Sequence, residues 1–148
     1  MEEFGLVAND GLATNPNSSN LYQVRSSAEV ALGHFDQAIS DAEQAIRLSP
    51  RDPQVGLRHV TIGDAEVGLG HLDAAIEEYQ KAIDAGYSNR IANMAGAYAL
   101  QGKMVEAKSV LAEALRAKPK LTVKLLTERW AVPPALAEGL RKAGLPEE

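Results

Sequence analysis

The sequence predicts an all-α fold in which antiparallel helix pairs stack into a right-handed superhelix and two further helices cap the C-terminal end. Three observations predict it. A glycine-centred segment recurs three times, alanines follow each glycine at fixed intervals, and the composition suits closely packed helices. Only 5% of the 148 residues are aromatic although 45% are hydrophobic, which favours helices packed through small side chains over a β-sandwich.

The recurring segment surrounds Gly33, Gly70 and Gly102, which lie about one helix pair apart. We expect each glycine in the tight turn between two helices, where a left-handed backbone suits glycine. A large apolar residue follows two positions later, and alanines follow at five and twelve. These residues are Phe35, Leu72 and Met104, then Ala38, Ala75 and Ala107, then Ala45, Ala82 and Ala114. The alanines lie on one face of the second helix and allow a close approach to the first.

The first helix of each pair carries a matching set of small residues. They lie seven and five positions before each turn glycine: Ser26, Gly63 and Ala95, then Ala28, Ala65 and Ala97. Pro50 and Pro119 are expected to end the second helices of the first and third pairs, because proline cannot continue a helix. Gly86 is expected to end the second helix of the middle pair.

This pattern resembles the tetratricopeptide repeat family, which implies a superhelix that binds protein segments. The sequence departs from the family pattern at several aromatic positions. The first-helix aromatic is replaced by His59 and Ile91 after Tyr22, and the family tyrosine survives only as Tyr98, with Glu29 and Glu66 at the matching places. We therefore expect polar packing near these two glutamates.

The expected organisation has five parts. They are residues 1–18 (the second helix of a truncated repeat), 19–52, 53–87 and 88–120 (three repeats), and 121–148 (capping helices). Pro16 lies one period before Pro50, which predicts that the chain begins inside a repeat and is a fragment of a longer protein. Terminal repeats need such a cap to cover their stacking face.

In the cap, an amphipathic helix is expected to turn Leu121, Leu125, Leu126 and Trp130 inward, and Pro133-Pro134 to open a last helix. Residues 138–147 resemble the C-terminal end of bacterial, rhizobial-type proteins that join a class III adenylate/guanylate cyclase domain to such repeats. The resemblance implies the C-terminal part of a signalling protein. None of the residues of a cyclase active site lies in this chain.

Several function classes are disfavoured. The net charge of −5 gives no general attraction to nucleic acids or anionic membranes, and Arg25, Arg58 and Arg90 are too few for a basic ridge. The chain has no cysteine, no apolar run long enough to cross a bilayer, and no signal-peptide pattern at its start, so we expect a cytoplasmic protein.

The candidate catalytic and metal-binding residues do not converge. His34 and His71 are expected in exposed turns one repeat apart, and His59 is interpreted as a packing residue, since no nucleophile matches it and Glu66. Acidic residues on the second helices are expected on a solvated face: Asp36, Asp41, Glu43, Asp73, Glu77, Glu78 and Asp84. We therefore expect no enzyme activity, cofactor or metal.

The concave groove is the candidate binding site. The first helices should line it with Gln23, Ser27, Val30, Val60, Asp64, Val67, Asn89, Ala92, Asn93, Gly96 and Ala99. A clamp for an anionic peptide tail needs cations, which this set lacks. The groove instead suits an apolar or helical protein segment, including one from the same polypeptide. The alternatives are a passive spacer and a homodimer formed by stacking on the incomplete first repeat.

Overall fold

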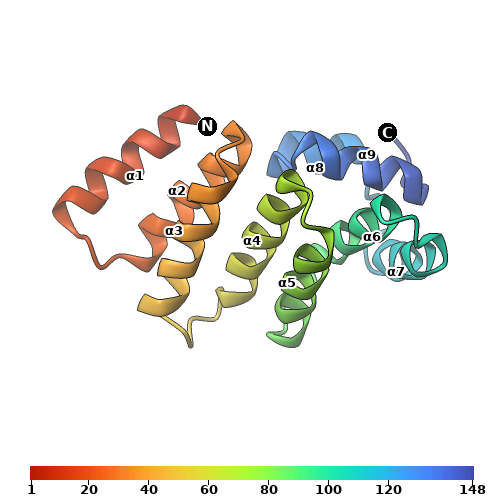
Figure 1. The fold of residues 1–148 in the computed structure, drawn as a ribbon, viewed down its shortest axis with the longest axis horizontal. Helices are drawn as coiled ribbons and strands as arrows, with labels where there is room; N and C mark the ends of the chain where they lie inside the picture. The colour runs from red at the N-terminus through yellow and green to blue at the C-terminus, as the bar shows by residue number, and fades with distance from the viewer.

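The computed structural model describes residues 1–148 and confirms the all-α prediction. It contains nine helices and no strands. The helices are α1 (Glu2–Thr14), α2 (Ser19–Leu32), α3 (Phe35–Leu48), α4 (Val55–Leu69), α5 (Leu72–Asp84), α6 (Ile91–Leu100), α7 (Met104–Ala117), α8 (Val123–Trp130) and α9 (Pro134–Ala143). Figure 1 shows the pairs α2–α3, α4–α5 and α6–α7 following one another, with α1 at one end of the long axis.

The turn glycines have the predicted backbone. Gly33, Gly70 and Gly102 adopt φ values of 80°, 81° and 79°, in the left-handed region that strains other residues. Gly33 and Gly70 end α2 and α4 directly. Each turn reverses the chain within a few residues, so the second helix of each pair runs back along the first.

Close approach between paired helices follows from the predicted small residues. Ala38, Ala75 and Ala107 are fully buried. The hydroxyl of Ser26 donates to the carbonyl of Ala38 at 2.6 Å, which ties α2 to α3 at their crossing. At Gly63, an added Cβ would lie 2.5 Å from the Tyr79 ring, so only glycine leaves room for this tyrosine.

The hydrophobic core is uneven along the superhelix. One continuous cluster of buried side chains extends from α4 through α9, whereas only a small cluster of Val30, Ala38 and Ala65 lies between the first pair and α4. Helix α1 packs on α2 through Ala8 and Leu12 and leaves Phe4, Leu6 and Val7 exposed. The C-terminal half of the molecule is therefore the more heavily packed half.

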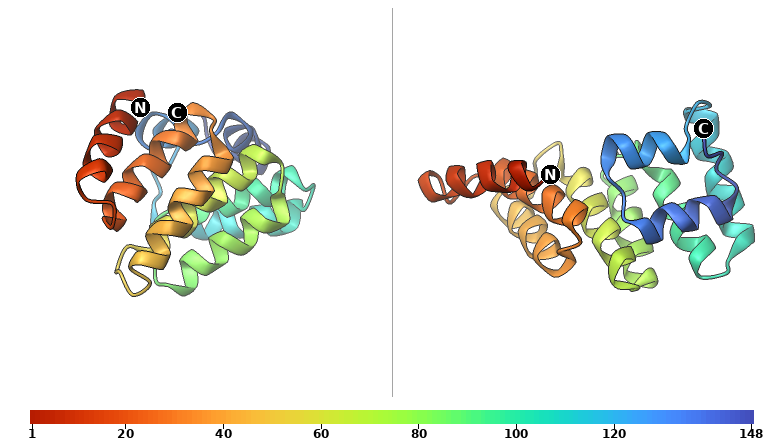
Figure 2. Two further views of the ribbon diagram at one scale, coloured as in Figure 1. Left: turned by 60° about the vertical axis from the view of Figure 1, so that its left-hand side comes forward. Right: turned by 90° about the horizontal axis from the view of Figure 1, so that it is seen from above.

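Of the two C-terminal helices, α9 packs on the third repeat and α8 packs on α9; Figure 2 shows both from two further directions. Helix α9 lies against α6, and Gly144, with φ of 102°, ends α9. The expectation that Leu125 points inward was wrong: Leu125 is 37% exposed, and Val123 is buried instead. The Thr122 hydroxyl accepts from the Leu125 amide at 3.1 Å and caps α8, so the helix starts at Val123 and presents a different face.

Candidate partner-binding groove

Two adjoining cavities form a groove along the inner helices. The first, of about 480 Å³, lies between α1, α2 and α4 and is lined by Phe4, Gln23 and Val24 among others. The second, of about 380 Å³, continues from it toward Asp64 and Trp130. Both cavities include Ser27 and Leu57, so they are parts of one groove.

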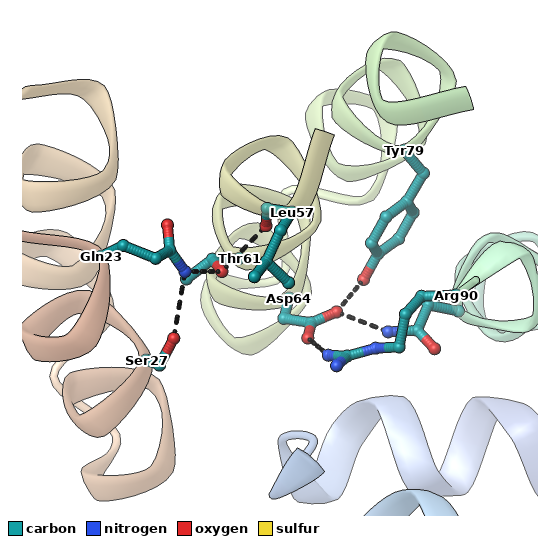
Figure 3. A network of polar contacts seen from close by, with 8 residues as sticks. Gln23, Ser27, Leu57, Thr61, Asp64, Tyr79 and Arg90 are labelled. Atoms are coloured by element: carbon teal, nitrogen blue, oxygen red, sulfur yellow. Dashed lines mark hydrogen bonds and ion pairs between the residues drawn. The ribbon is translucent and has the colours of Figure 1, made fainter. Parts of the chain in front are cut away.

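A polar bridge forms the floor of the groove where the two cavities meet (Figure 3). The Gln23 amide of α2 donates to the Ser27 hydroxyl at 3.1 Å and to the Thr61 hydroxyl of α4 at 2.9 Å. Thr61 in turn donates to the Leu57 carbonyl at 3.1 Å. The bridge joins the first two repeats, and it leaves the buried Gln23 Oε1 without a hydrogen-bond partner.

A second polar cluster surrounds Asp64 on α4 (Figure 3). Its Oδ1 accepts from the Tyr79 hydroxyl at 2.7 Å and from the Asn93 amide at 2.8 Å. Its Oδ2 accepts from Arg90 Nη2 at 2.8 Å. Burial, and secondly the Asp64 charge, raises the pKa of Tyr79 well above its ordinary value, so Tyr79 remains a hydrogen-bond donor.

The sequence placed eleven residues in the groove, and only four of them line its cavities in the structure, three of which are themselves mostly buried. Gln23, Ser27, Val30 and Asp64 line the two cavities. Six others are buried in the packed interior: Val60, Val67, Ala92, Asn93, Gly96 and Ala99. Asn89 lines neither of these cavities but a third one.

Helix α9 covers the face of α6 that was expected to line the groove in the third repeat. An added Cβ at Gly96 would lie 2.8 Å from Leu136, and one at Gly139 would collide with the Gly96 carbonyl. The small residues of α6 therefore accommodate a helix of the same chain. The open groove is confined to the first two repeats and the end of α8.

The expectation that the groove lacks cations was also wrong, because Arg90 lines it. Sequence reasoning also missed Leu57, Thr61 and Trp130. A signal for the arginine was present: Arg25, Arg58 and Arg90 recur about one repeat apart. Arg58 and Arg90 share a register, twelve residues before Gly70 and Gly102, whereas Arg25 lies eight residues before Gly33 in the middle of α2.

Each of these arginines has an acidic partner, which for Arg25 and Arg90 lies on another helix and for Arg58 lies in the loop before α4. Arg25 binds Asp41 through two bonds, the Nη2–Oδ1 bond being 2.7 Å. Arg58 donates to Asp52 at 2.8 Å, and Arg90 to Asp64. Asp41 is therefore buried, which corrects its expected place on a solvated face.

The histidines lie apart from one another. His59 contacts Glu78 at 2.7 Å, and His71 contacts Glu66 at 2.7 Å, so His59 and Glu66 do not form a pair. No three His, Asp or Glu side chains come close enough together to hold a metal ion. None of the nine helices combines the length and apolar character needed to cross a membrane.

Comparison with known proteins agrees with the geometry. Residues 19–52 match one tetratricopeptide repeat model, and residues 60–121 match a second. Together the two matches span more than half of the chain and cover the three helix pairs described above. No curated protein matches the chain. The helix pairs and both matches show that the chain belongs to the tetratricopeptide repeat family.

Proposed function

We propose that this protein is a non-catalytic interaction module whose groove between α2, α4 and α8 binds a segment of a partner protein. One observation carries the proposal: the groove combines a hydrogen-bonded floor with exposed apolar side chains at its edge. Phe4 and Val24 are 58% and 39% exposed beside the Gln23–Thr61 bridge. Exposed apolar surface beside fixed polar groups is typical of recognition sites.

The floor is suited to a peptide backbone as well as to side chains. Gln23 Oε1 is buried without a donor, and an amide N–H from a bound segment would satisfy it. The Asp64 carboxylate already holds three donors, so it is a structural part of the wall. We therefore expect a neutral or apolar segment in this groove.

The test is peptide-display selection on the purified protein, followed by titration of a selected peptide against variants. Val24→Glu places a charge in the groove, whereas Val105→Glu makes the same change at an 81% exposed site on α7. We expect Val24→Glu to weaken binding at least tenfold and Val105→Glu to leave it unchanged. Equal affinities for the two variants, both helical by circular dichroism, would exclude the groove.

Self-association is a second candidate, favoured by the outer face of α1. Leu6 and Val7 are 61% and 60% exposed on neighbouring positions of this helix. A second copy could cover them. Sedimentation equilibrium should then show a dimer that Leu6→Lys dissociates, and a monomer at every accessible concentration would reject this candidate.

A finer proposal concerns the parent protein. We propose that the module regulates or positions a nucleotide cyclase domain in a bacterial cytoplasmic protein, on the strength of the resemblance in residues 138–147. The coding sequence upstream of Met1 tests this directly. An open reading frame without a cyclase domain would reject it and leave the interaction module unaffected.

A further inference from the structure

A third cavity, of about 610 Å³, adjoins the second cavity of the groove, and Arg90, Arg129 and Trp130 line both of them. We call it the Trp130 pocket. The loop before α6, the segment after α7, and α8 form its walls. Leu121, Leu125 and Trp130 supply apolar surface, and Leu125 is 37% exposed.

The Trp130 pocket is strongly cationic in a protein of net charge −5. Four basic residues line it, and no acidic residue does: Arg90, Lys118, Lys120 and Arg129. Arg90 has Asp64 as a partner, whereas the other three form no ion pair. Uncompensated like charges around one cavity create a local positive potential that attracts anionic groups.

Three of these cations gather around the same indole ring. The guanidinium carbons of Arg129 and Arg90 lie 5.1 and 5.3 Å from the ring centroid of Trp130, and Lys118 Nζ lies 5.8 Å from it. The aromatic face holds the cations near each other without neutralising them. An anionic ligand would relieve this repulsion while its apolar part covers the ring edge.

Arg90 provides an independent indication of a missing partner. Its side chain is 6% exposed and lines the pocket, yet its Nε–H is buried and has no acceptor. An unpaired donor on a buried charged group is costly, and an acceptor oxygen on a ligand would remove that cost.

We propose that the Trp130 pocket binds an acidic segment of a partner protein. An apolar side chain of the segment packs against Trp130, Leu121 and Leu125, and its flanking carboxylates contact Lys118, Lys120 and Arg129. The apolar wall favours a peptide over a nucleic acid or a membrane surface, which would meet the acidic remainder of the molecule. This inference rests on the proposed interaction function and names the chemistry of a partner.

Trp130 is the only tryptophan, so its fluorescence reports on the pocket directly. The probe is a blocked synthetic peptide, Glu-Asp-Glu-Leu-Phe-Glu-Asp-Glu, titrated at low and high salt. We expect saturable binding that weakens with salt. Lys120→Glu and Arg129→Glu should each weaken it by about tenfold, because each change replaces an attraction by a repulsion.

The matched control is Lys108→Glu, which makes the same charge change at an exposed position on α7 away from the pocket. It should bind like the parent protein, and the groove variant Val24→Glu should also do so. These two controls distinguish binding in the Trp130 pocket from binding in the groove. If only Val24→Glu loses binding, the peptide binds in the groove, which rejects the pocket proposal and supports the proposed function.

Other outcomes would also overturn the proposal. They are no fluorescence response to the peptide, equal binding of a peptide with Lys in place of every acidic residue, or tighter binding of single-stranded DNA or phosphatidylserine vesicles. A dimer in sedimentation that Arg129→Glu dissociates would assign the pocket to a second copy and so reject a separate partner.

Discussion

The Asp64 carboxylate accepts a 2.8 Å hydrogen bond from Arg90, and this ion pair connects α4 to the residue directly before α6. Both side chains are nearly completely buried, at 3% and 6% exposure. Tyr79 of α5 donates to the same carboxylate, so three elements of neighbouring repeats meet at one charge. Arg90 then extends from this charge to Trp130 and links the repeat interface with the cap.

Removing Asp64 should leave the buried charge of Arg90 without its partner. We expect Asp64→Ala to lower the free energy of unfolding by about 3–5 kcal/mol. The exposed Asp10→Ala on α1 serves as a control and should change it by less than about 0.5 kcal/mol. Urea denaturation followed by circular dichroism measures both, and a small effect of Asp64→Ala would show that water enters the site.

We predict that Arg58 stabilises the fold and does not contribute to a basic binding surface. It is fully buried and donates to the carbonyls of Ala45 and Ser49 at 3.2 and 3.1 Å, which caps the C-terminal end of α3 from α4. Arg58→Met retains much of the side-chain volume but removes these two hydrogen bonds and the bond to Asp52, while each carbonyl keeps one backbone donor. We expect a loss of about 1–3 kcal/mol in thermal or urea unfolding.

The control for this prediction is Arg51→Met, which removes the same charge at an exposed position in the same connection. It should have little effect. Similar losses in both variants would attribute the effect to net charge and would contradict a capping role for Arg58.

Two glycine-to-alanine changes should act in opposite directions. At Gly139, an added Cβ would collide with the Gly96 carbonyl, so Gly139→Ala should destabilise the α6–α9 contact by about 1–3 kcal/mol. At Gly5 in α1, it would make an ordinary 3.8 Å contact with Ala28, so Gly5→Ala should stabilise by up to about 1 kcal/mol. Unfolding midpoints measure both, and equal shifts would reject the close packing of α9.

The sequence predicted the repeats because their constraints are local and recur. Gly33, Gly70 and Gly102 are required by the backbone of a turn, and Ala38, Ala75 and Ala107 by the distance between adjacent helices. These requirements act within one repeat and leave a fixed spacing in the chain.

The groove was predicted less well because burial on the inner face depends on a distant helix. Ala92, Gly96 and Ala99 have the small side chains of an open groove, and the same side chains suit the docking of α9. The small side chains of α6 therefore do not tell whether this face is open or covered by α9. Arg90 was missed for a related reason, since its partner Asp64 lies 26 residues away in the preceding repeat.

Glu29 gives the stability of the protein a specific dependence on pH. It occupies a family tyrosine position, and burial, with the nearby Asp41 charge as the second cause, raises the pKa of Glu29 to about 7 from 4.5. Arg25 does little to offset this, because its guanidinium already binds Asp41 through two hydrogen bonds.

The folded protein therefore binds more protons than the unfolded chain between these two pKa values. The contribution of Glu29 to stability is present below about pH 4.5, falls as the pH rises to about 7, and stays low above that. Glu29→Gln cannot ionise, and its amide can donate to Asp41 at every pH. We expect the variant to exceed the parent in unfolding free energy at pH 8 and to approach it at pH 5.

Urea denaturation of parent and variant at pH 5, 6, 7 and 8 measures this difference, with the exposed Glu113→Gln as a matched control. The control should follow the parent at every pH, because it makes the same substitution on the exposed surface of α7, away from Asp41. If Glu29→Gln also runs parallel to the parent from pH 5 to 8, Glu29 ionises in the folded protein as it does in water. The polar site at the α2–α3 contact would then be open to solvent.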